Sequence, residues 1–191
     1  MRLRPILFAL LLALPHLLVA DETWRGAADV KFRGYSTLHN FEGTVKQVPL
    51  KVTVTGGEKD RVVSATSNVE VKDMSTAHEG RDKNMMTMFQ QAKHRFIQVE
   101  VDDAKEQTLR PPGGGAGEMP VKVTIAGTTG TISAKVTNVV EAETRGSFDL
   151  SFPVSLKQFK LDPPKSLGGL VKVRDNVDVT VRVVLKKEGA K

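Results

Sequence analysis

The sequence has 191 residues, a formal net charge of +6, one Trp, one Tyr and no Cys. Without cysteine the chain has no disulfides, no thiol catalysis and no thiolate metal sites. The basic residues are dispersed and the aromatic side chains are too few for a base-stacking platform, so we expect no nucleic-acid partner.

The first segment has the pattern of a secretory signal peptide. Arg2 and Arg4 precede an apolar run at residues 6–14, and a proline ends that run. The run is shorter than the about 20 residues of a membrane-spanning helix, although an uncleaved anchor is the alternative. We therefore expect a signal at residues 1–20 and one periplasmic or secreted domain at residues 21–191.

Alternation of apolar and polar residues predicts about eight β-strands in the mature chain. A short N-terminal segment at residues 21–28 comes before the first strand. That strand is expected to turn at Gly43, where the second begins. The predicted strands cover residues 30–41, 44–55, 62–72, 96–102, 121–126, 131–140, 145–156 and 176–185.

One helix is predicted, at about residues 81–93, after the third strand. Met85, Met88, Phe89 and Ala92 recur there at spacings of three and four, which places them on one face of a helix. Such a stripe is equally typical of ordinary core packing and of contact with a lipid. The Pro- and Gly-rich segment at residues 110–117 is predicted to be a surface hairpin loop.

Strands of this kind indicate an all-β fold, an antiparallel sheet with one apolar face. Eight such strands can close into a barrel wide enough for one small ligand. A sandwich of two sheets is the alternative, because periodicity alone does not separate the two folds.

Five short segments carry a resemblance to a known family. They are Ser-Thr-Leu-His-Asn-Phe-Glu-Gly at 36–43, Met-Ser-Thr at 74–76, Arg-Asp at 81–82, Ile-Ala-Gly-Thr-Thr at 125–129 and Leu-Val-Lys-Val-Arg-Asp at 170–175. With this order of features the chain resembles the YceI-like family, exported lipocalin-like barrels associated with polyisoprenoid binding.

The resemblance implies an eight-stranded antiparallel barrel whose apolar lumen holds the isoprenoid chain of a quinone or a polyprenyl phosphate. His39, Arg81 and Lys83 would lie near the headgroup, and apolar residues of the strands and helix would contact the tail. The candidate ligand-binding residues are His39, Phe41, Arg81, Lys83, Met85, Met88, Phe89, Ile97, Val99, Phe148 and Phe152.

Catalysis and metal binding have less support in the sequence. His39 and His78 could converge beside Asp82 or Glu42, but metal sites usually need three or four ligands. No nucleophile-elbow pattern surrounds a serine. We therefore expect a binding protein that is not an enzyme and has no cofactor or metal. One alternative is an envelope protein with a filled barrel that docks a partner through its surface. Another is an enzyme that uses His39 with Asp82. Whether the chain forms a homodimer is left open.

Overall fold

The structure of the chain is a computed structural model that describes residues 21–57, 60–111, 115–166 and 171–189. The expected signal peptide at residues 1–20 lies outside these residues, as does part of the predicted loop, at 112–114. Across the described ranges, none of the helices has both the length and the apolar character needed to cross a membrane.

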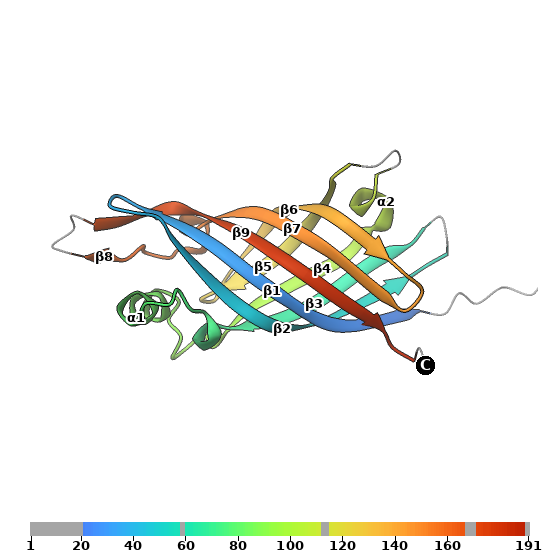
Figure 1. Cartoon of the computed structure of the whole chain (residues 1–191), viewed down its shortest axis with the longest axis horizontal. Helices are drawn as coiled ribbons and strands as arrows, with labels where there is room; N and C mark the ends of the chain where they lie inside the picture. The colour runs from blue at the N-terminus through green and yellow to red at the C-terminus, as the bar shows by residue number, and fades with distance from the viewer. Residues whose placement is uncertain (1–20, 58–59, 112–114, 167–170, 190–191) are drawn as a thin grey trace, which may run out of the picture.

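Long strands dominate the described residues, with short helices at the two ends of the sheet (Figure 1). The strands are β1 (Glu22–Ser36), β2 (Phe41–Thr55), β3 (Val62–Glu70), β4 (Phe96–Lys105), β5 (Gly117–Ile125), β6 (Thr128–Glu141), β7 (Arg145–Ser155), β8 (Lys165–Ser166) and β9 (Val171–Lys187). The helices are η1 (Val71–Asp73), α1 (Glu79–Met88), α2 (Glu106–Leu109) and η2 (Lys157–Phe159).

The sheet closes on itself. Neighbouring strands pair antiparallel in the order β1-β2-β3-β4-β5-β6-β7-β9, and β1 also pairs with β9. The closing register runs from Trp24 opposite Lys187 to Ser36 opposite Val173. The short β8 pairs with β9. This confirms the predicted eight-stranded antiparallel barrel and excludes the two-sheet sandwich.

The strands place apolar side chains inside and polar ones outside. In β9, Val177, Val179 and Val181 face the interior, while Asp178 and Thr180 are exposed on the outer surface. The inward valines are only half-buried, because they border an internal space instead of packing against one another.

Two predictions about the N-terminal hairpin are wrong. Nearly all of the segment at residues 21–28 is strand instead of a lead-in, because β1 begins at Glu22 and pairs with β2 from there and with β9 from Trp24. The turn after β1 lies at residues 37–40, and Gly43 lies inside β2, opposite Phe32. Ser36 holds this turn: its hydroxyl donates to the carbonyl oxygen of His39 at 2.6 Å and accepts from the His39 N–H at 3.1 Å.

Gly43 has a packing role instead of a turning role. A Cβ atom at position 43 would lie 2.1 Å from the Phe32 ring, so the end of the ring occupies the space above the glycine. A reciprocal pair follows two residues along each strand, where Phe41 covers Gly34, and a Cβ there would lie 2.2 Å from the ring. Glycines in strands mark such close approaches.

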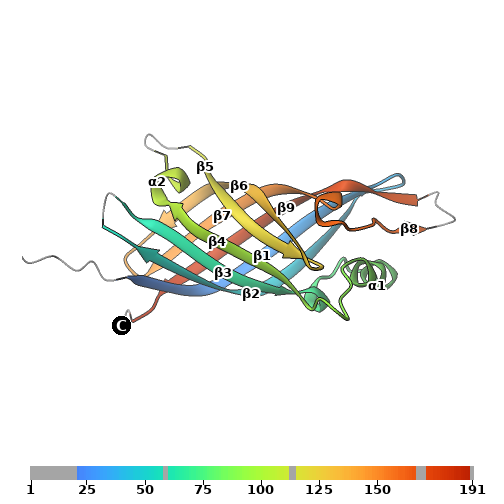
Figure 2. The ribbon, with the colours of Figure 1, turned by 180° about the vertical axis from the view of Figure 1, so that it is seen from behind.

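The predicted helix exists, but its bounds differ. Helix α1 begins at Glu79, capped by the His78 side chain, and ends at Met88 instead of continuing to residue 93. Gln90 has a φ of 52°, a left-handed conformation that stops the helix, and turns follow it. Helix α2 has no counterpart in the sequence prediction. The two helices lie at opposite ends of the barrel in both views (Figures 1 and 2), which we name the α1 end and the α2 end.

Replacing Gly43 by alanine should destabilise the barrel by about 1–3 kcal/mol, because the new methyl group must displace the Phe32 ring from a packed interior. Urea unfolding followed by circular dichroism measures this. The matched control is Gly57→Ala, where nothing lies within 4 Å of the added Cβ; we expect a change within about 0.5 kcal/mol there. Equal effects of the two substitutions would contradict the packing role of Gly43.

Candidate functional site

A cavity of about 930 Å³ occupies the interior of the barrel. Its lining extends from Arg81 at the α1 end to Arg110 at the α2 end, and all eight long strands contribute side chains. This volume lies in the upper part of the roughly 300–1,000 Å³ range typical of small-molecule sites. The cavity is therefore large enough to hold a ligand along the barrel axis.

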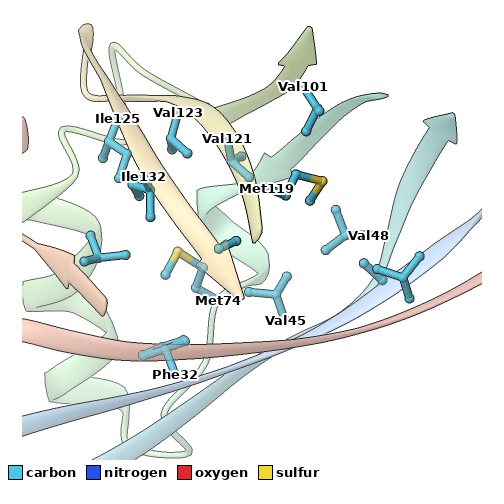
Figure 3. Close-up of a cluster of buried hydrophobic side chains, with 14 of the residues drawn as sticks. Phe32, Val45, Val48, Met74, Val101, Met119, Val121, Val123, Ile125 and Ile132 are labelled. Carbon is cyan, nitrogen blue, oxygen red and sulfur yellow. The ribbon is translucent and has the colours of Figure 1, made fainter. Parts of the chain in front are cut away.

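The wall of the cavity is almost entirely apolar between its two ends, with Thr66 and Ser67 of β3 as polar exceptions. Figure 3 shows side chains of β1, β2, β4, β5 and β6 that point into one common interior, among them Phe32, Val45 and Val121. Met74 and Met119 add two flexible thioethers to the same wall. An interior of this kind offers a ligand desolvation and dispersion contacts.

Three segments meet at the α1 end and give the cavity its polar rim: the turn after β1, the residue that caps α1 and the first turns of α1 itself. The guanidinium of Arg81 lies over the ring of Phe41, 4.9 Å from its centroid, at cation–π distance. The polar side chains lining this end are those of Ser36, His39, His78, Arg81 and Asn84.

Asp82 ties α1 to the barrel. Its carboxylate accepts hydrogen bonds from the Thr76 N–H at 2.8 Å, from the Thr76 hydroxyl and from the Ser75 hydroxyl at 3.1 Å. Ser75 in turn exchanges two backbone hydrogen bonds with Thr44 of β2. Burial raises the pKa of Asp82, but the hydrogen bonds from Thr76 and Ser75 outweigh it and hold the pKa below its usual range.

The structure places the predicted polar residues on different sides of α1. Arg81, Asn84, Met85 and Met88 line the cavity, at the three- and four-residue spacing of one helix face. Lys83 is exposed and does not line the cavity, and its expected place near a headgroup stays a prediction. Helical phase predicts this exposure, because position 83 falls on the face opposite to 81 and 85. His39 and Phe41 line the cavity at the α1 end.

The predicted apolar residues all line the same cavity. Met85 and Phe89 are buried where α1 meets the barrel. The others face the cavity from the helix, β4 and β7, and each is half-buried: Met88, Ile97, Val99, Phe148 and Phe152.

The sequence does not predict the chain of alternating charges that lies at the α2 end. Glu106 lies at its centre, with its carboxylate 3.2 Å from Arg61 Nε and 4.0 Å from Arg110 Nη1. Arg110 also contacts Glu141 at 2.6 Å, and Arg61 contacts Glu22 at 3.6 Å. A hydrogen bond from Lys187 holds the pKa of Glu22 below its usual range. The full order is Lys187, Glu22, Arg61, Glu106, Arg110 and Glu141.

This charge chain lines one end of the cavity with groups that are paired with one another. Arg61, Glu106, Arg110 and Glu141 all line the cavity there. Gly117 lets α2 approach, since a Cβ at that position would lie 2.0 Å from the Leu109 carbonyl oxygen. No local sequence signal identifies this network, because its members come from five separate segments of the chain.

The described residues contain no group of three or more His, Asp or Glu side chains arranged to hold a metal ion. Among the same residues no hydrogen bond joins His39 to Asp82, whose carboxylate oxygens are engaged by Thr76 and Ser75. The geometry of the α1 end thus offers hydrogen-bond donors and one cation, arranged around an apolar opening.

Comparison with known proteins gives one family match. A family model described as a YceI-like domain matches residues 25–185. A search of curated proteins found no match.

Solved structures share the fold at low sequence identity. The crystal structure of Burkholderia cenocepacia BcnA superposes with a TM-score of 0.64 at 17% identity, covering 82% of this chain and 95% of that one. A polyisoprenoid binding domain from Saccharophagus degradans, described as implicated in plant cell wall breakdown, has a TM-score of 0.61 at 12% identity and covers 85% and 97%. A Campylobacter jejuni YCEI protein has a TM-score of 0.51 at 15% identity and covers 74% and 82%.

Protonation of Asp82 should loosen α1. Because the folded-state pKa is depressed, the stability from this carboxylate is present above its unfolded-state pKa of about 3.9 and is lost as the pH falls through the folded-state value. We expect Asp82→Asn to cost about 1 kcal/mol at pH 7 and to reduce the loss of stability below about pH 4. Urea unfolding at a series of pH values measures both. The control is Asp162→Asn at an exposed position. If the stability of Asp82→Asn had the same pH dependence as that of the wild type, Asp82 would not hold α1 against the barrel.

Removing the central acid of the charge chain should weaken the α2 end. We expect Glu106→Gln to destabilise the protein by about 1 kcal/mol at low ionic strength and by less at high salt, because the partly exposed pairs are screened. Denaturant unfolding at two salt concentrations measures the difference. Glu100→Gln is the control, since Glu100 pairs with Lys122 at 2.8 Å on the outer surface, away from the charge chain. A salt-independent loss in Glu106→Gln would show that the network does not act through charge.

Proposed function

The chain belongs to the YceI-like family, and we propose that it binds an isoprenoid lipid whose hydrocarbon tail occupies the barrel cavity. One observation carries this proposal: the cavity of about 930 Å³ is walled by apolar side chains from all eight long strands. A filled barrel that acts only through its outer surface does not account for such a space.

The energetics favour a long hydrocarbon tail. Each 100 Å² of tail surface transferred from water to the wall contributes about 2.5 kcal/mol. Part of this gain offsets the entropy lost when a flexible tail is ordered. The thioethers of Met85, Met88 and Met119 adapt their shape to a ligand, which suits a tail with several rotamers.

The comparisons support an isoprenoid over other lipids. The Saccharophagus degradans domain with the same fold is described as polyisoprenoid binding, and the family model covers most of this chain. Two headgroups suit the proposed role, a quinone and a polyprenyl phosphate. In either case the headgroup lies at the α1 end, beside His39 and Arg81, and the tail extends towards α2.

The proposed role is binding in the cell envelope, without catalysis. The basic and apolar pattern at residues 1–20 supports export to the periplasm or out of the cell. Between the two ends, the described side chains along the wall offer a ligand mainly apolar contacts, and the hydroxyl of Ser67 there donates to the Pro49 carbonyl oxygen, which supports a carrier or a lipid buffer.

Lipid extraction and native mass spectrometry of the protein, purified from its own host, test the proposal directly. We expect an isoprenoid to co-purify at up to one per chain. In vitro, geranylgeraniol should change the fluorescence of Trp24, the single tryptophan of the sequence, because its side chain lines the cavity. Absence of both signals would reject the proposed function.

A pair of neighbouring substitutions locates the site. Val181 faces the cavity, whereas Thr180 is exposed on the outer surface of the same strand. Val181→Phe should fill part of the cavity and weaken geranylgeraniol binding at least about tenfold, a loss of about 1.4 kcal/mol. Thr180→Phe should leave the affinity unchanged. Melting temperatures confirm that both variants fold, and equal affinities would place the ligand outside the barrel.

A further inference from the structure

The two ends of the cavity carry different charges. Among the described residues that line it, the carboxylates are Glu106 and Glu141, and both lie at the α2 end. There they pair with Arg61 and Arg110, so that end presents neutralised charge. At the α1 end, within the part of the chain that the structure describes, Arg81 is the one lining Arg or Lys and no carboxylate lines the cavity beside it.

Arg81 is held in place without being neutralised by an ion pair. It is half-buried, and within the described ranges no ion pair involves its side chain. Its guanidinium lies over the Phe41 ring, which occupies one face of the planar group. The N–H donors point outward along the edges of that plane, so they stay available to a ligand.

The neighbouring carboxylates do not compete strongly for these donors. Asp82 attracts Arg81 through space, but its oxygens accept hydrogen bonds from Thr76 and Ser75. Glu79 is exposed and does not line the cavity. The positive charge of Arg81 is therefore directed towards the opening of the cavity.

Other donors surround the same opening. His78 Nδ1 accepts from the Arg81 N–H at 3.3 Å, so its Nε2 carries the proton and can donate. Asn84 follows on the same face of α1, and His39 comes from the facing turn. These groups come from three segments, and all of them line the cavity.

From this arrangement we propose that the α1 end is an anion site that selects an isoprenoid with a phosphate or diphosphate headgroup over a neutral quinone. The inference rests on the proposed function and specifies its ligand. A guanidinium fork matches the oxygens of a phosphate group in a bidentate geometry, and charge-assisted hydrogen bonds of this kind are about twice as strong as neutral ones. A quinone carbonyl is a neutral acceptor and leaves the charge of Arg81 uncompensated at the edge of an apolar cavity.

The inference also fixes the direction of the ligand. At the α2 end Glu106 and Glu141 already pair with Arg61 and Arg110, so an anionic headgroup would find no uncompensated cation there. At the α1 end it meets a cation whose charge is not cancelled by an ion pair within the described residues. The tail therefore extends from α1 towards the charge chain, where a polar end offers it no further apolar contact.

Ligands with the same tail and different headgroups test the proposal. Geranylgeranyl diphosphate, geranylgeraniol and a prenylated quinone are titrated at low salt, with binding followed by Trp24 fluorescence and checked by calorimetry. We expect the wild-type protein to bind the diphosphate at least tenfold more tightly than the alcohol or the quinone. Equal affinities, or a preference for the quinone, would overturn the inference while leaving the proposed function intact; failure of all three ligands to bind would reject both.

Substitutions on the two faces of α1 assign the preference to one residue. Arg81→Gln should abolish the tenfold preference for diphosphate over alcohol, and Arg81→Lys, which keeps the charge but loses the fork, should retain a smaller part of it. Lys83→Gln removes the same charge from the opposite face and should keep the full preference. An unchanged ratio in Arg81→Gln, or an equal loss in Lys83→Gln, would overturn the inference.

Two further measurements distinguish a lipid headgroup from free phosphate and from a folding defect. Inorganic diphosphate should compete with the lipid at least a hundredfold more weakly than its own prenylated form; equal competition would identify a site for free phosphate instead. Melting temperatures show whether Arg81→Gln folds. If it does not, the ratio measured in Arg81→Lys and Asn84→Ala decides the question, and an unchanged ratio in both would overturn the inference.

Discussion

β1 forms backbone hydrogen bonds with β2 on one side and with β9 on the other along most of its length. This double pairing brings the two ends of the described chain together and removes both free edges of the sheet. Since the sequence has no cysteine, backbone pairing and side-chain packing alone maintain the closure. Every inward side chain then faces the same enclosed space. Valine is the commonest of these side chains and is too short to meet a partner across the axis of an eight-stranded barrel, so a cavity remains.

Two glycine–phenylalanine pairs connect the closed sheet to the α1 end. Phe32 lies on Gly43 and Phe41 lies on Gly34, so bare backbone on one strand accommodates an aromatic ring from its neighbour. Phe41 in turn supports the guanidinium of Arg81 from below. A side chain at position 34 would displace that ring, and with it the support of Arg81. The geometry of the α1 end is therefore set by the backbone of β1 as much as by the helix.

Local periodicity predicts the strands well and the connections between them less well, and it does not by itself distinguish a barrel from a sandwich. Strict alternation in the last strand, at Val177, Val179 and Val181, is sufficient to predict a sheet with one apolar face. The glycine at position 43 wrongly suggests a turn, because its contact with Phe32 is a long-range feature that no local pattern shows. The start of β1 escapes prediction because the small residues at 26–28 blur the alternation. Helical phase alone places Lys83 outside the cavity lining. The charge chain around Glu106 joins residues that are far apart in the sequence, so only the closed barrel reveals it.

The half-buried valines of the cavity wall affect the stability of the protein and its resistance to proteases. An empty barrel leaves this apolar surface in contact with water, and a lipid that binds only the folded chain stabilises it in proportion to the logarithm of its free concentration. Proteases act on transiently opened chains, so under the proposed function molecules without lipid are degraded first. The half-life of the protein then follows the supply of the proposed lipid, and its abundance reports how much of that lipid is available.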